Sequence, residues 1–178
     1  MSDLRYMLGN YVPRNGSLPK HGLTLHDLGE LLRRAGLAAG FIVESEFRVR
    51  INNRSRDSKI DWVWLSPEQP WKPILAVEIE GRDVAPKSVK EDVEKFKKCE
   101  PIIKVIALFQ VDHDRNSKKV IKKPDPCKRV IQIAETYCSM QNVECSDLQV
   151  VLDEELFQPE GIEKLQVAAR NAIAREAV

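Results

Sequence analysis

The sequence lacks any apolar run long enough to cross a membrane. No stretch of roughly 18 apolar residues occurs, which excludes a membrane-spanning helix. The amino-terminal segment also lacks the apolar stretch of a secretory signal. From these two absences we expect a cytoplasmic protein with no membrane partner.

Cysteine is scarce and shows no pattern. The four cysteines, Cys99, Cys127, Cys138 and Cys145, include no C-x-x-C pair. Zinc sites and disulfide frameworks use closer or paired spacing. We therefore expect free thiols in a reducing compartment.

Net charge is nearly absent as well. The 178 residues carry 28 basic and 27 acidic side chains, for a formal net charge of +1. A protein that coats nucleic acid through bulk charge alone is far more basic, so that class is excluded. The charge is nevertheless uneven, because residues 1–85, 86–129 and 130–178 carry +1, +6 and −6.

The turn region at residues 48–59 carries a local charge of +4. Phosphate contacts need such local clusters, and a neutral total does not forbid them. The candidate nucleic-acid-binding residues of this turn are Arg50, Arg54, Arg56 and Lys59. A solvated basic face is the alternative interpretation.

What the chain does contain is enough apolar material for one core. Hydrophobic residues make up 43% of the sequence, and 178 residues suit a single domain. Residues 1–22 are rich in proline and glycine and predict an irregular arm, which leaves residues 23–178 as the domain.

Hydrophobic periodicity predicts the order of helices and strands within this domain. We expect helices near residues 25–39, 86–99, 127–141 and 160–176, and strands near residues 41–51, 59–65, 74–80, 102–109 and 148–152. Short connections join the first three strands, which favours an antiparallel meander. A crossover helix then brings the fourth strand parallel to the third. The predicted fold class is α/β, with a mixed central β-sheet flanked by helices.

The most informative residues lie at the end of the third predicted strand. Alternation puts Glu78 and Glu80 on one face of a buried strand, where two unpaired carboxylates would cost several kcal/mol. A divalent cation would remove both the burial cost and the mutual repulsion. Asp61, on the neighbouring strand, is the natural third oxygen ligand. Such a donor set suits Mg²⁺, with Mn²⁺ as a substitute.

The spacing Asp61, Glu78, Glu80 resembles the D…(D/E)-x-K signature of the PD-(D/E)XK nuclease-like superfamily, also called restriction endonuclease-like, in its E-x-E variant. The resemblance extends over residues 24–110 and includes the order of an opening helix, a meander, a helix and a parallel strand. Glu80 stands where the signature has lysine. In some members the lysine comes from the following helix, and Lys90 is our candidate there.

The resemblance implies a role for each site residue. Asp61 and Glu78 would hold Mg²⁺ together with the carbonyl of Ile79, and Glu80 would hold a second ion or orient the attacking water. Glu30, in the helix before the meander, is the candidate further acid, and Lys90 would place positive charge near the scissile phosphate.

The function implied is that of a metal-dependent endodeoxyribonuclease, restriction- or repair-like, acting on DNA or another nucleic acid. One alternative is a catalytically inactive module of the same fold that binds nucleic acid or serves assembly. Another is an unrelated α/β protein in which Glu78 and Glu80 pair with arginine or lysine. The helix at residues 160–176 could form a homodimer or pack on its own sheet.

Overall fold

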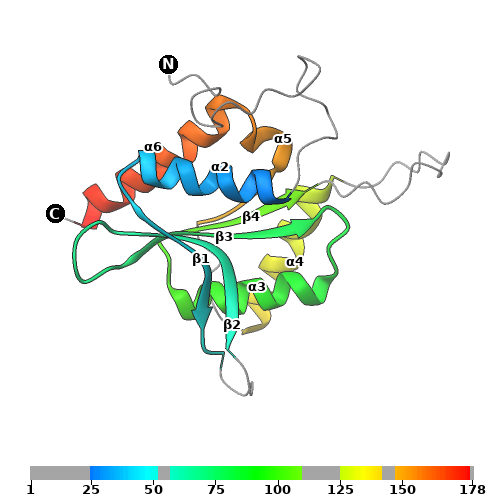
Figure 1. The fold of residues 1–178 in the computed structure, drawn as a ribbon. Helices are drawn as coiled ribbons and strands as arrows, with labels where there is room; N and C mark the ends of the chain where they lie inside the picture. Colours follow the sequence, from blue (N-terminus) through cyan, green and yellow to red (C-terminus); the bar gives the residue numbers. More distant parts are fainter. Residues whose placement is uncertain (1–24, 52–56, 110–124, 142–146, 177–178) are drawn as a thin grey trace, which may run out of the picture.

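A five-stranded mixed sheet runs through the centre of the protein (Figure 1). The computed structural model describes residues 25–51, 57–109, 125–141 and 147–176. The strands are β1 (Ile42–Val49), β2 (Ser58–Leu65), β3 (Pro73–Gly81), β4 (Ile103–Phe109) and β5 (Leu148–Leu152), and they lie in the sheet in that order. The first three strands are antiparallel neighbours, whereas β3, β4 and β5 are parallel.

Helices cover both faces of this sheet. They are α2 (Leu25–Ala38), α3 (Pro86–Cys99), α4 (Pro126–Gln141), α5 (Asp153–Leu156) and α6 (Pro159–Glu176). In Figure 1, α2 and α6 lie on one face and α3 and α4 on the other. The two crossover helices α3 and α4 lie on the same face because both connections are right-handed and both lead from one strand to the next in the direction from β3 to β5.

The α/β mixed-sheet class predicted from the sequence is confirmed, and each expected helix and strand within the described residues is present. The short helix α5 was not expected, because four residues are too few to show a helical period. The expected arm at residues 1–22 lies outside the described residues.

Two apolar layers result from this arrangement. The first joins α2, α5 and α6 to one face of the sheet, around Leu32, Trp64, Val77 and Leu165. The second joins α3 and α4 to the other face, around residues such as Ala76 and Phe96. Because Ile162, Leu165, Ala169 and Ala172 of α6 are buried in the first layer, this helix packs on its own sheet.

Helix α2 approaches the sheet closely at two glycines. A Cβ atom added at Gly29 would lie 2.9 Å from Cζ2 of Trp62, and one added at Gly36 would lie 2.7 Å from Nε1 of Trp64. The two positions are seven residues apart and therefore on the same helical face. Small residues at these positions let the tryptophans of β2 pack directly against the helix backbone.

No helix among the described residues has both the length and the apolar character needed to cross a membrane. Cys99 and Cys127 are free thiols, whereas Cys138 is disulfide-bonded, so the expectation of free thiols is wrong at Cys138.

Candidate functional site

Asp61 lies where β2 separates from β3. The last backbone pair at this end of the β2–β3 ladder is Trp62 with Val77. At the preceding residue of β2, a side chain replaces the backbone pairing between the two strands. Asp61 Oδ2 accepts a hydrogen bond of 2.7 Å from the backbone N–H of Ile79. This bond holds the half-buried Asp61 side chain beside the peptide that joins Glu78 to Glu80.

Glu78 and Glu80 project from β3 toward α3. The Glu78 side chain is almost completely buried, with 3% exposed, whereas Glu80 is half-buried. Leu75 and Val77 belong to the opposite apolar layer, so the alternation along this strand is the one expected from the sequence. The charge of Asp61 acts on both glutamates, which places the three carboxyl groups in one neighbourhood.

Helix α3 adds two residues that sequence reasoning missed, Asp92 and Lys95. Lys95 Nζ lies 2.9 Å from Glu78 Oε1 and 3.0 Å from Asp92 Oδ1. Asp92 is 1% exposed, and the negative charge of Glu80 acts on its carboxyl group. We call Asp61, Glu78, Glu80, Asp92 and Lys95 the carboxylate cluster.

The sequence contains a signal that could have identified Asp92. Val89, Asp92, Val93 and Phe96 follow the i, i+3, i+4, i+7 spacing of a buried helical stripe. An aspartate in such a stripe is costly to bury unless it has a partner, so it indicates a polar group on the facing strand.

The carboxylate cluster carries more negative than positive charge. Burial, followed by the charge of Asp92, raises the pKa of Glu78 to about 9. Burial also raises the pKa of Glu80, and it raises the pKa of Asp92 to about 7. Burial alone would lower the pKa of Lys95, but Glu78 and Asp92 together raise it, so the ammonium stays charged. One ammonium does not neutralise four carboxylates, and the cluster therefore favours the uptake of protons or of further cations.

Two buried oxygen atoms of the cluster remain without a hydrogen bond. They are Glu78 Oε1, whose contact with Lys95 is ionic and poorly directed, and Asp92 Oδ2. Carboxylate oxygens of this kind are the donors that Mg²⁺ and Mn²⁺ prefer. No group of three or more His, Cys, Asp or Glu side chains in the described part of the chain is already arranged to hold a metal ion. An ion would thus bind by turning carboxylates that now face Lys95 toward a common point.

Lys90 does not reach the carboxylate cluster. It is exposed, and its Nζ lies 5.7 Å from the centre of the Tyr137 ring on α4. At about 100° per residue, Lys90 and Lys95 flank the buried stripe of α3 on opposite sides. The lysine that the structure brings to the carboxylates is Lys95.

Glu30 has partners within its own helix. Its two carboxylate oxygens accept hydrogen bonds of 2.6 and 2.7 Å from Arg34 and Arg33. These bonds, with Arg33 first, lower the pKa of Glu30 to about 2. Since α2 covers the face of the sheet opposite α3, the structure does not bring Glu30 into the carboxylate cluster (Figure 1).

The basic turn is only partly described. Arg50 is exposed, and Lys59 Nζ forms an ion pair of 2.6 Å with Glu46 across the β1–β2 hairpin. Arg54 and Arg56 lie outside the described residues.

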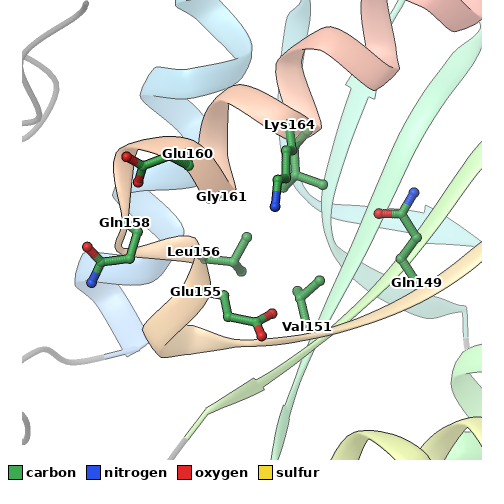
Figure 2. A pocket seen from close by; sticks show the side chains of 9 residues that line it. Gln149, Val151, Glu155, Leu156, Gln158, Glu160, Gly161 and Lys164 are labelled. Atoms are coloured by element: carbon green, nitrogen blue, oxygen red, sulfur yellow. The ribbon is translucent and has the colours of Figure 1, made fainter.

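A separate pocket of about 360 Å³ lies at the other edge of the sheet. Figure 2 shows Lys164 of α6, Glu155 of α5 and Gln149 of β5 around the pocket, together with the apolar side chains of Val151 and Leu156. None of the site residues expected from the sequence lines this pocket. Val151 packs against the α2–α6 layer, so the pocket and the carboxylate cluster are on opposite faces of the sheet.

Comparison with protein-family models, with curated proteins and with solved structures finds no match for this chain.

Proposed function

We propose that this protein is a metal-dependent nuclease that hydrolyses phosphodiester bonds of DNA, in the manner of PD-(D/E)XK restriction or repair enzymes. One observation carries the proposal. Asp61, Glu78 and Glu80 from two strands and Lys95 from the following helix converge at the point where β2 and β3 separate. This combination supplies hard oxygen donors and a cation in one half-buried place.

The position of Lys95 adds support for a catalytic role that the sequence did not provide. The signature lysine is absent at Glu80, but an ammonium from α3 contacts the Glu78 carboxylate at 2.9 Å. A fixed positive charge in a site with little water stabilises the charge that develops on a phosphoryl group during hydrolysis. Lys95 thus provides what the E-x-E sequence lacks on β3.

Asp61 and Glu78 are the residues that would hold Mg²⁺, with the Ile79 carbonyl as the third ligand that the resemblance implies. When bound, the ion lowers the pKa of a coordinated water and neutralises charge on the phosphate. The chain itself holds Asp61 in place through the Ile79 N–H, orients the attacking water with Glu80, and places the Lys95 ammonium near the phosphate.

DNA is the proposed partner because basic residues are concentrated near one end of the sheet. Arg50, Arg54 and Arg56 lie between β1 and β2 in the sequence, and Lys59 is the second residue of β2, the strand that carries Asp61. We propose that this turn contacts the phosphate backbone. A homodimer would let two such sites cut both strands, and light scattering of the purified protein tests that state.

A cleavage assay with isosteric variants tests the proposed function. Plasmid DNA is incubated with wild type, Asp61→Asn, Glu78→Gln and the control Glu94→Gln, in Mg²⁺, in Mn²⁺ and in EDTA. Glu94 is a suitable control because it lies on α3 but bonds to the Tyr137 hydroxyl at 2.8 Å. We expect metal-dependent cleavage by wild type and Glu94→Gln, reduced at least 100-fold in the two site variants.

The same assay separates the proposal from its alternatives. Binding of DNA without cleavage, unaffected by Asp61→Asn or Glu78→Gln, would identify an inactive binding module. If the protein neither binds nor cleaves DNA, the carboxylate cluster is a structural ion network.

A further inference from the structure

We propose that the outer edge of β5 binds an extended, basic peptide segment of another protein, which continues the sheet as a further strand. Peptides that add to a sheet edge gain affinity from main-chain hydrogen bonds and specificity from pockets that receive alternate side chains. The β5 edge offers both, together with a negative charge that selects the partner. This inference does not depend on the proposed nuclease function, because no residue of the carboxylate cluster takes part in it.

The two edges of the sheet, β1 and β5, differ in how they oppose a further strand. On β1, the charged residues Glu44, Glu46 and Arg48 are exposed, and Glu46 adopts a φ of 50° at a position that the pairing with β2 skips. Charge and an irregular backbone prevent pairing at an edge. In contrast, β5 carries no charge and pairs with β4 at each of its 5 residues.

Two residues of β5 present their backbone groups to the outside. In parallel strands, alternate residues bond to a given neighbour. The carbonyl of Asp147 accepts a hydrogen bond of 3.2 Å from β4, so the next residue, Leu148, faces away from β4, as does Val150. The N–H of Leu152 is on the same outer side and donates to Glu155 Oε2 at 3.4 Å. In the described part of the chain, no such bond reaches Leu148 or Val150, which leaves their N–H and C=O groups to an added strand.

The side chains of β5 provide a surface on each face for those of an added strand. On the α4 face, Leu148, Val150 and Leu152 are only partly buried, so apolar side chains of a partner would pack against them. On the α6 face, Gln149 and Val151 line the pocket of about 360 Å³ (Figure 2). Directly opposed residues of paired strands point to the same face. Every second side chain of the added strand would therefore lie at this pocket.

Charge selects a basic partner. The pocket is lined by the carboxylates of Glu155 and Glu160 and by the ammonium of Lys164, and residues 130–178 carry −6 in total. A second copy of this chain would bring two such negative segments together, and DNA would be repelled in the same way. Lysine or arginine side chains of a peptide would instead complement the two glutamates.

A synthetic peptide built for this geometry tests the inference. The probe is an acetylated and amidated hexapeptide of alternating lysine and valine, whose lysines face the pocket when its valines face Leu148 and Val150. Amide hydrogen exchange of the full chain is followed by nuclear magnetic resonance with and without the peptide. We expect exchange of the Leu148 and Val150 amide protons to slow about tenfold. Exchange at Val151, which already pairs with β4, should not change.

Matched peptides and variants separate main-chain pairing from charge. N-methylation of the valines keeps the charge and the side chains but blocks the peptide edge that meets β5, so it should abolish the protection. Replacement of the lysines by glutamate should do the same. In the protein, Glu155→Gln combined with Glu160→Gln should weaken binding of the lysine peptide about fivefold. The control Glu135→Gln, on the exposed side of α4, should leave it unchanged.

Each contrary result overturns the inference. Unchanged exchange at Leu148 and Val150 excludes an added strand at β5, and equal binding of the N-methylated peptide reduces the interaction to charge. A glutamate peptide that binds as well as the lysine peptide contradicts the choice of a basic partner. A dimer in light scattering, with the same two amide protons already protected, assigns the edge to a second copy of this chain.

Discussion

At the scale of single residues, the most unusual environment is that of Glu78, which is buried beside Asp61, Asp92 and Lys95. Its pKa is raised from an ordinary 4.5 to about 9, mainly by burial. Below pH 4.5 the carboxyl group is protonated in both the folded and the unfolded state. Above that pH the unfolded state loses the proton and the folded state keeps it, so stability falls as the pH rises toward 9.

We therefore predict that Glu78→Gln flattens the pH dependence of folding stability in metal-free buffer. The wild type should lose roughly 1.4 kcal/mol per pH unit through this group between about pH 5 and pH 8, and the variant should not. Urea unfolding at several pH values in EDTA measures the free energy of unfolding of both proteins. Parallel curves for the two proteins would contradict the buried, protonated state of Glu78.

A second prediction at this scale compares the two lysines that flank the stripe of α3. Because Lys95 contacts Glu78 and Lys90 lies over Tyr137, Lys95→Gln should reduce cleavage at least 100-fold. Lys90→Gln should change it less than about threefold, since the group it removes lies away from the cluster. The measurement is the initial rate of plasmid cleavage in Mg²⁺. Equal losses in both variants would mean that the lysines act through general DNA affinity.

The sequence located the strand acids but not the residues of α3, for a geometrical reason. The period of two along a strand places Glu78 and Glu80 on one face, whichever element packs against that face. A helical stripe, in contrast, has two flanks, and only the packing of α3 on the sheet decides which flank meets β3. Lys90 and Lys95 were therefore equivalent in the sequence, and Glu30 could not be assigned before its arginine partners were seen.

At the scale of elements, the contact between α2 and β2 depends on two glycines with different neighbours. At Gly36 an added Cβ would lie 2.5 Å from Val43 Cγ2 and 2.7 Å from the fully buried Trp64. At Gly29 the three nearest atoms all belong to the ring of Trp62, which is partly exposed and therefore has room to shift.

We predict that Gly36→Ala destabilises the protein by about 1–3 kcal/mol, and that Gly29→Ala costs clearly less. Both changes raise helix propensity by the same amount, so the difference isolates the packing. Urea unfolding of the two variants and wild type provides the comparison. A Gly29→Ala variant that is less stable than Gly36→Ala would show that Trp62, not Trp64, is the fixed contact.

The elements themselves were the most predictable part of the fold. Strands such as β3 and β4 are nearly continuous apolar runs, and α3 begins at Pro86 as a first-turn proline predicts. The short helix α5 could not be foreseen, because Asp153–Leu156 is fixed by contacts made in three dimensions. One such contact is the ion pair of 2.7 Å between Arg82 and Asp153.

At the scale of the whole molecule, charge is distributed unevenly across a nearly neutral chain. The basic turn joins β1 and β2 at one edge of the sheet, whereas β5 and the acidic α5 lie at the other edge. If the basic turn contacts phosphate, removal of a positive charge should weaken DNA binding more at the β1–β2 edge than at the β5 edge.

We predict that Arg50→Ala weakens binding of duplex DNA and reduces the slope of log affinity against log salt by about 1. Lys164→Ala removes the same charge beside the pocket at β5 and should leave the slope unchanged. Fluorescence anisotropy between 50 and 200 mM salt, an interval over which such contacts weaken markedly, gives both slopes. Equal effects of the two substitutions would indicate binding by total charge.

The hydrogen bond from the Ile79 N–H to Asp61 also decides how an inactive protein should be made. An alanine at residue 61 would remove the acceptor and leave a backbone donor of β3 without a partner, which costs about 1–3 kcal/mol. Loss of cleavage in that variant could then result either from the missing metal ligand or from a displacement of β3. Asparagine keeps an acceptor oxygen and removes only the charge. A gap in stability between the alanine and asparagine variants would report how firmly one side chain, in place of a backbone ladder, holds the two strands together.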